Sequence, residues 1–187
     1  VEQVAAVPGV AAASPQLYLS TLRGATCCSV PEMFLIAYDP ATDFTLRPWL
    51  KDSAGPGLKP GEAVAGSEIA SRMETHGKSA AEFEIGGYPL RLAAALEPTG
   101  TRLDQALFLS FETVAALAVR SELSLPATGG SSGELSAVLV QVEPGADPYA
   151  VAVELMHVVP GINPVTSLDL FQSYRRQLTG LLRSVVV

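Results

Sequence analysis

The chain has 187 residues, of which 48% are apolar and only 17% charged, with a net charge of −7 and a mean hydropathy of +0.30. This composition is too apolar for a disordered chain, and the length suffices for one sizeable core or two small subdomains. No apolar run reaches the about 18 residues that a membrane-spanning helix needs. Lys and Arg are too scattered for a nucleic-acid surface, so we expect no nucleic-acid partner.

A short sequence motif occurs twice, and each copy predicts the end of a helix followed by a strand. Residues 1–10 read Val-Glu-Gln-Val-Ala-Ala-Val-Pro-Gly-Val, and residues 153–162 read Val-Glu-Leu-Met-His-Val-Val-Pro-Gly-Ile. Glycine accepts the left-handed backbone that ends a helix, and proline prevents its continuation. The two copies predict one small α/β layer whose halves are separated by a long insertion. Because the first copy begins within a helix, we expect the sequence to be a piece of a longer protein.

Apolar and alternating runs predict strands at residues 11–23, 33–38, 62–65, 82–87, 88–96, 106–109, 137–142 and 162–165. Caps and apolar spacing predict helices at residues 67–75 after a Ser67 cap, at 112–120 after Ser110, and from the Asp147-Pro148 cap to Pro160-Gly161. Gly86-Gly87 predicts a hairpin turn. Residues 44–50 predict a short helix or turn with Leu46, Trp49 and Leu50 directed inward.

A final helix is predicted from Ser167, with apolar residues recurring at spacings of three and four, namely Leu168, Phe171, Tyr174, Leu178, Leu182 and Val185. The pattern leaves two interpretations open. The helix either packs on the core or approaches a membrane segment that follows it.

Several segments, in their order along the chain, resemble the periplasmic core domain of MacB/FtsX-like ABC transporter permeases. They are Val-Pro-Gly-Val-Ala at 7–11 with Ser-Pro at 14–15, Leu-Lys-Pro-Gly-Glu-Ala-Val-Ala-Gly at 58–66, Phe-Glu-Ile-Gly-Gly-Tyr-Pro-Leu-Arg-Leu at 83–92, Leu-Glu-Pro-Thr-Gly-Thr at 96–101 and Leu-Phe-Leu-Ser at 107–110. The resemblance covers nearly the whole chain, and the order of these pieces is more specific than any one of them.

The resemblance implies an α+β fold, in which a porter-like split βαβ layer is interrupted by a mostly β, Sabre-like subdomain. Residues 1–44 with 134–170 would form the porter-like part, residues 45–133 the insertion, and residues 171–187 a helix leading toward the membrane. It also implies a non-catalytic domain in the periplasm or extracytoplasmic space of a membrane protein. Its partners would be an ABC ATPase subunit that binds ATP in the cytoplasm, a second permease copy and a periplasmic protein.

Motifs for catalysis are missing from the sequence. There is no G-x-x-x-x-G-K-[S/T] phosphate loop, no G-x-S-x-G elbow and no H-E-x-x-H metal motif. The two histidines, His76 and His157, are separated from each other and suit a helix end and ordinary packing. We therefore expect no enzyme activity and no cofactor in this chain.

Cys27 and Cys28 are the only cysteines and are adjacent, so no distributed disulfide framework is formed. Three interpretations stay open: a pair of thiols, a vicinal disulfide, or metal ligands that act with Met33 on a soft ion or with Asp39 or Asp43 on a harder one. The last two would make the chain a periplasmic metal-binding or thiol-redox protein, which is the main rival to a permease domain.

Charged and aromatic residues gather in sequence around the two cysteines. A candidate surface for cargo or a partner therefore consists of Arg23, Asp39, Asp43, Arg47 and Trp49. Charged residues near a loop are more often simply solvated, and that interpretation also stays open.

The metal hypothesis makes a prediction for the double variant Cys27→Ser, Cys28→Ser. If thiolates hold an ion, the variant binds copper, zinc and iron more weakly than the parent, as measured by equilibrium dialysis. Equal binding by the two proteins would exclude the metal interpretation.

Overall fold

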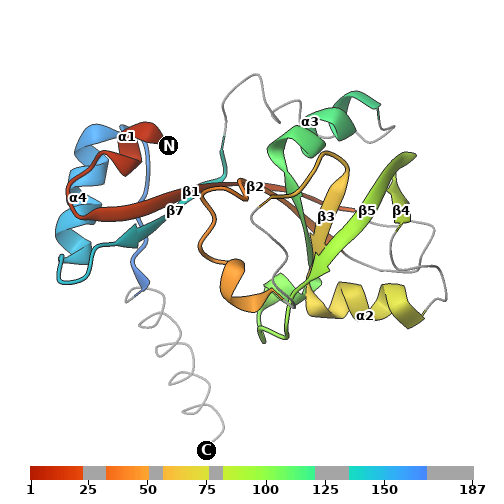
Figure 1. Ribbon diagram of the computed structural model, residues 1–187. Helices are drawn as coiled ribbons and strands as arrows, with labels where there is room; N and C mark the ends of the chain where they lie inside the picture. Colours follow the sequence, from red (N-terminus) through yellow and green to blue (C-terminus); the bar gives the residue numbers. More distant parts are fainter. Residues whose placement is uncertain (23–32, 51–56, 76–81, 121–134, 168–187) are drawn as a thin grey trace, which may run out of the picture. The chain divides into compact units, whose positions relative to one another are not determined.

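A computed structural model describes residues 1–22, 33–50, 57–75, 82–120 and 135–167 (Figure 1). Within these ranges the strands are β1 (Val10–Leu22), β2 (Met33–Tyr38), β3 (Glu62–Ala65), β4 (Glu82–Ile85), β5 (Tyr88–Ala95), β6 (Ala106–Ser110) and β7 (Ala137–Val142). The α-helices are α1 (Glu2–Ala5), α2 (Ser67–Thr75), α3 (Phe111–Arg120) and α4 (Pro148–Val158), and two 3-10 turns are η1 (Arg47–Trp49) and η2 (Arg102–Gln105).

The strands form one mixed sheet in the order β4-β5-β3-β6-β2-β1-β7. Strand β6 is parallel to β2 and antiparallel to β3, while β3 is parallel to β5. Strands β1 and β2 are antiparallel, as are β4 and β5. Glu143 N–H donates to the Gly9 carbonyl and Ser136 N–H to the Gln16 carbonyl, so β7 runs antiparallel to β1. The predicted α+β class is confirmed.

The chain divides into two compact units. The terminal unit is Val1–Ala13 with Val140–Val187, and the central unit is Ser14–Leu139. Strands β1 and β7 each contribute residues to both units, so the backbone passes between the units twice within paired strands. The subdomain limits expected from the sequence, at residues 44 and 133, stay a prediction.

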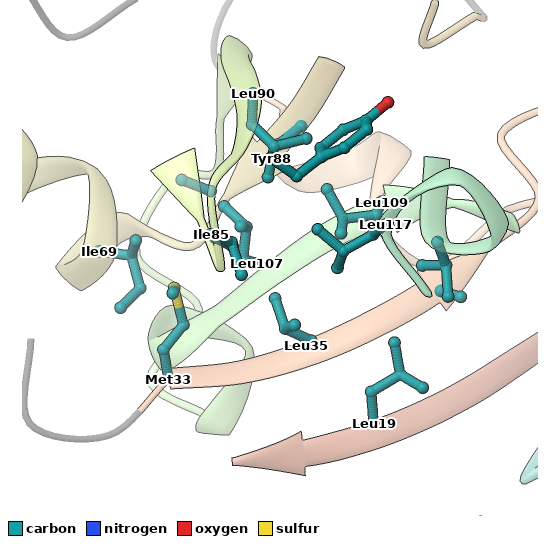
Figure 2. Packing of buried hydrophobic residues seen from close by; sticks show 14 of the residues in the cluster. Leu19, Met33, Leu35, Ile69, Ile85, Tyr88, Leu90, Leu107, Leu109 and Leu117 are labelled. Atoms are coloured by element: carbon teal, nitrogen blue, oxygen red, sulfur yellow. The ribbon is translucent and has the colours of Figure 1, made fainter. Parts of the chain in front are cut away.

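One face of the central sheet packs against two helices. Leu35, Leu107 and Leu109 are fully buried there beneath Ile69 of α2 and Leu117 of α3 (Figure 2). Apolar side chains spaced three and four apart along each helix produce this contact, because such spacing places them on one face. Burial of each side chain of this size stabilises the fold by about 1.5–3 kcal/mol.

The other face of the central sheet is also apolar. Tyr38, Val64 and Phe108 lie in a second cluster with Leu46 and Leu96, which come from connecting segments rather than helices. The rings of Tyr38 and Phe108 meet edge to face with centroids 6.1 Å apart. The central strands are therefore buried on both faces, which explains their continuous apolar sequence.

The terminal unit has its own small core. Val4 and Val7, at and just after α1, are buried in this unit, as are Val151 and Leu155 of α4, and the two helices contact each other. Gly9 has a φ of +87°, and a Cβ at this position would lie 2.8 Å from Cγ2 of Val151. The first Pro-Gly stop therefore requires glycine both for its backbone conformation and for close packing.

Local sequence signals predicted several features correctly. Gly86 and Gly87 both have positive φ and join β4 to β5 in the expected hairpin. The Ser110 hydroxyl accepts the Thr113 N–H at 3.1 Å and caps α3. Asp147 accepts the Tyr149 N–H at 3.0 Å and caps α4, with Pro148 in its first turn.

Other local predictions were wrong. Residues 162–165 form no strand, and Ile162 and Val165 are exposed. Trp49 is 39% exposed rather than inward, whereas Leu46 is buried as expected. Helix α2 begins at Ser67 itself, so this serine is the first helical residue rather than the cap. The first two predictions relied on apolar character alone. Apolar character does not reveal which strand or surface is available to cover a side chain.

Gly66 provides a test of the packing between β3, α2 and η2. A Cβ at Gly66 would lie 2.1 Å from the Leu103 carbonyl oxygen and 2.5 Å from that of Asp104, and backbone atoms cannot rotate away. We expect Gly66→Ala to lower the free energy of unfolding by about 3 kcal/mol or more. The measurement is urea denaturation, with Gly57→Ala as control because nothing lies within 4 Å of a Cβ there. Equal midpoints for the two variants would contradict the packing.

Candidate functional site

The loop between β2 and η1, together with the first residue of η1, contains three of the residues predicted to form a cargo or partner surface. Asp39 accepts the Ala41 N–H at 2.9 Å and the Thr42 hydroxyl at 3.1 Å. Asp43, only 3% exposed, accepts the Leu46 N–H at 3.0 Å and the Thr45 hydroxyl at 2.7 Å.

Arg47 completes the same loop. Its Nη2 donates to the carbonyls of Pro40, at 3.3 Å, and Ala41, at 3.2 Å. Asp39, Asp43 and Arg47 therefore all form hydrogen bonds with atoms of this loop, and their role in a cargo or partner surface stays a prediction. Their hydrogen bonds are made to the loop itself, so these side chains hold the loop in shape, and Trp49 is the large exposed side chain at its end.

A cavity of about 280 Å³ lies in the central unit beside this loop. Its lining residues come from β2, β3, β5 and the segment before β3: Tyr38, Leu50, Gly57, Leu58, Glu62, Val64, Arg91, Leu92, Ala93 and Ala94. Leu50, Leu58 and Val64 supply apolar surface, while Tyr38, Glu62 and Arg91 supply polar groups. The volume suits a small molecule or one side chain of a partner.

Glu62 and Arg91 form an ion pair in this cavity, because parallel pairing of β3 with β5 places the two residues opposite each other. Glu62 also accepts the Lys59 N–H at 3.0 Å. That backbone hydrogen bond is the main cause that lowers the pKa of the Glu62 carboxyl, and Arg91 adds to it against the opposing effect of burial. The Arg91 side chain stays 56% exposed and retains donors for an acidic group.

Tyr38 is the other polar group of the cavity. Burial, and then the nearby carboxylates of Asp43 and Asp39, raises the pKa of its hydroxyl above the ordinary value of 10.0. The hydroxyl is therefore neutral and available for hydrogen bonding. Ser, Cys and His are absent from the residues described as lining the cavity, so these residues offer charge and hydrogen bonds for binding but no activated nucleophile.

The structure describes only some of the predicted metal ligands. Cys27, Cys28 and Arg23 lie outside the described residues, and the metal hypothesis stays a prediction. Met33 is fully buried in the core of the central unit. Among the described residues no three His, Cys, Asp or Glu side chains gather to hold a metal ion, and no helix is long and apolar enough to cross a membrane.

The fold is similar to two solved structures of transporter domains. The extracellular domain of the noncanonic ABC-type transporter YknZ from Gram-positive bacteria shares 12% identity at a TM-score of 0.52, over 81% of this chain and 75% of that chain. The periplasmic region of MacB from Actinobacillus actinomycetemcomitans shares 11% identity at a TM-score of 0.55, over 83% of this chain and 71% of that chain.

At identities this low, the structural similarity shows a common fold and nothing more. The MacB/FtsX-like fold expected from the sequence is confirmed. No sequence profile of a known protein family matches the chain, and no curated protein matches it in sequence.

The cavity was missed by sequence reasoning. Glu62 and Arg91 are far apart along the chain, and only the register between β3 and β5 makes them neighbours. The one available signal was that each is a charged residue in an otherwise apolar strand, which favours a paired position.

Glu62 gives a prediction for stability against pH. Because its pKa is lowered on folding, its stabilisation is complete above the ordinary value of 4.5 and is lost as the pH falls through the folded value. We expect Glu62→Gln to reduce the free energy of unfolding by about 2 kcal/mol at neutral pH, and the difference from the parent to shrink in acid. Urea denaturation at neutral and acidic pH measures this. Glu84→Gln, at an exposed site on β4, is the control, and a constant difference across pH would contradict the assignment.

Proposed function

We propose that this chain is the extracytoplasmic domain of an ABC transporter permease. The fold carries the proposal, because one solved structure compared above is the extracellular domain of an ABC-type transporter and the other is the periplasmic region of MacB. The sequence supports the proposal independently of the fold, through the order of its segments at 7–15, 58–66, 83–92, 96–101 and 107–110.

The domain itself is non-catalytic in this proposal, and it uses no cofactor. ATP is bound and hydrolysed by a cytoplasmic ABC ATPase subunit or domain, in keeping with a sequence that contains no phosphate loop. Conformational change reaches the domain through membrane helices of the same permease.

The binding role belongs to the central unit. Exposed Trp49 and the cavity with Glu62 and Arg91 form the surface that engages cargo or an extracytoplasmic partner protein. Aromatic and Arg side chains are the types most often found at the energetic centre of protein interfaces, which favours this surface over the exposed acidic ones. A second permease copy completes the transporter in the membrane.

A second candidate function rests on the adjacent thiols of Cys27 and Cys28. A metal-binding or thiol-redox role would use this pair directly, either in a permease specialised for metal or in a separate periplasmic protein. The observation that favours it is the adjacency itself, because two neighbouring thiols can form a strained ring or chelate a soft ion.

The permease proposal is tested by topology labelling of the parent protein in cells. Val119, 87% exposed on α3, is replaced by Cys after Cys27→Ser and Cys28→Ser. We expect a membrane-impermeant maleimide to label Val119→Cys in intact cells, and the protein to stay in the membrane after alkaline extraction.

The control is a cysteine placed in the cytoplasmic ATPase, which is labelled only after lysis. Labelling of Val119→Cys only after lysis, or release of the protein by alkaline extraction, would contradict the proposal.

A further inference from the structure

The cavity of the central unit has an irregular strand in its wall. Ala63 pairs with Leu92, but Val64 pairs with Ala94, so β5 contains one residue more than β3 at this point. Successive side chains of a regular strand lie on opposite faces of the sheet, whereas here the consecutive residues 91–94 all line the cavity. Bulges of this kind redirect side chains and are frequent next to active sites. The bulge therefore favours a site that holds a ligand.

Much of the cavity is lined by apolar side chains that the described residues cover only in part. Leu50, Leu58 and Ala94 pack against the second cluster of the central unit, yet each stays partly exposed. Val64 belongs to that cluster and is buried. We call these four residues the apolar wall of the cavity. An apolar ligand placed against the apolar wall removes its exposed surface from water, which is favourable.

The charged residues of the cavity indicate the polar group of the ligand. Both carboxylate oxygens of Glu62 are occupied, since Oε1 accepts from Arg91 and Oε2 accepts the Lys59 N–H at 3.0 Å. Arg91 uses Nη2 for this pair, and its side chain is 56% exposed against 10% for Glu62. A guanidinium carries further N–H donors in a planar fork that matches a carboxylate. The group that can still bind a ligand is therefore a cation, and its partner is a carboxylate.

The other charged groups around Arg91 are compatible with an anion at this position. Glu82 lies opposite Arg91 across the pairing of β4 with β5, but it is exposed and is not among the described lining residues. Among the ion pairs of the described residues, Arg91 is paired with Glu62. Lys59 is near enough to Glu62 to help lower the pKa of its carboxyl, so a second cation borders this part of the cavity.

The surroundings of Tyr38 favour a ligand with one acid group. Tyr38 lines the cavity, and the carboxylates of Asp43 and Asp39 lie near enough for their charges to act on its hydroxyl. A second acid group placed beside Tyr38 would be repelled by both carboxylates, whereas an uncharged chain would not.

We propose that the cavity binds a small free monocarboxylate with an apolar body. The carboxylate binds Arg91, and the body packs against the apolar wall. The cavity volume of about 280 Å³ is at the lower end of the range for ligand pockets, so the ligand is small. This inference rests on the binding role proposed for the central unit, and it names the chemical class of the cargo.

The test is isothermal titration calorimetry of the purified 187-residue chain with octanoate, octanol and octylamine. The three probes share an eight-carbon chain and differ in charge. We expect octanoate to bind saturably at one site per chain, and the neutral and cationic probes to bind at least about tenfold more weakly, which corresponds to about 1.4 kcal/mol. Inorganic phosphate, an anion without an apolar body, is also expected to bind at least about tenfold more weakly than octanoate.

Two variants locate the binding site. Arg91→Gln removes the cation and should weaken octanoate binding at least about tenfold. Arg102→Gln is the matched control and leaves the affinity unchanged, because Arg102 is exposed, stacks on the Phe34 ring and is not among the described lining residues. Ala94→Leu fills the cavity while Glu62 and Arg91 stay in place, and it should weaken octanoate binding by a similar factor. Urea denaturation establishes that each variant is folded.

Octanol, octylamine or phosphate binding as tightly as octanoate would overturn the proposal. So would an unchanged affinity for octanoate in either folded variant, or no saturable binding of octanoate by the parent. The purified chain is measured without membrane or ATPase. Failure of this inference therefore leaves the permease proposal standing, and topology labelling decides that proposal separately.

Discussion

The structure depends on burial of β6 from both sides of the sheet. Leu107 and Leu109 are fully buried beneath α2 and α3, and Ala106 and Phe108 are fully buried on the opposite face. The residues of β3 that pair with β6, Ala63 to Ala65, are likewise apolar on both faces, while Glu62 stands at the first position of the strand, before this pairing. A strand in this position has no face that tolerates a charge or a water-exposed cavity, because an unpaired polar group there would lose its hydrogen bonds to water.

This constraint determines where polar groups can occur. They lie at the ends of the buried strands and in the connecting segments, where backbone donors are free to pair with them. Asp104 is the clearest case, because it accepts the N–H groups of Thr99 and Gly100, both at 2.8 Å. Burial alone would raise the pKa of its carboxyl. The hydrogen bonds from these N–H groups and from neighbouring hydroxyls outweigh burial, so the pKa is lowered. Asp43 likewise accepts backbone N–H groups, those of Thr45 and Leu46, in the loop after β2. The cavity with Glu62 and Arg91 is lined by the segment before β3 together with residues of β2, β3 and β5.

Much of this architecture could be predicted from the sequence, because the responsible signals are local. The double glycine of the β4–β5 hairpin, the Ser110 and Asp147 caps and the Pro-Gly stop at Gly9 each act within a few residues. The resemblance to permease domains likewise came from short segments in a fixed order.

The failures concern partners that are distant in the sequence. Residues 162–165 have strand-like composition but form no strand, and Trp49 is exposed although its side chain is apolar. The Glu62–Arg91 pair arises only from strand register, which a single sequence does not reveal. The contact between Gly66 and the backbone of η2 is of the same kind.

The central claim is that this fold serves as the extracytoplasmic part of a membrane transporter. The most direct measurement is the hydropathy of the parent reading frame on both sides of the chain. The account predicts an apolar segment of about 20 residues shortly before Val1 and another shortly after Val187, each long enough to span the bilayer. Polar flanks, or a cleavable signal peptide followed by a stop codon after Val187, would contradict it and leave the Cys27-Cys28 pair as the leading indication of function.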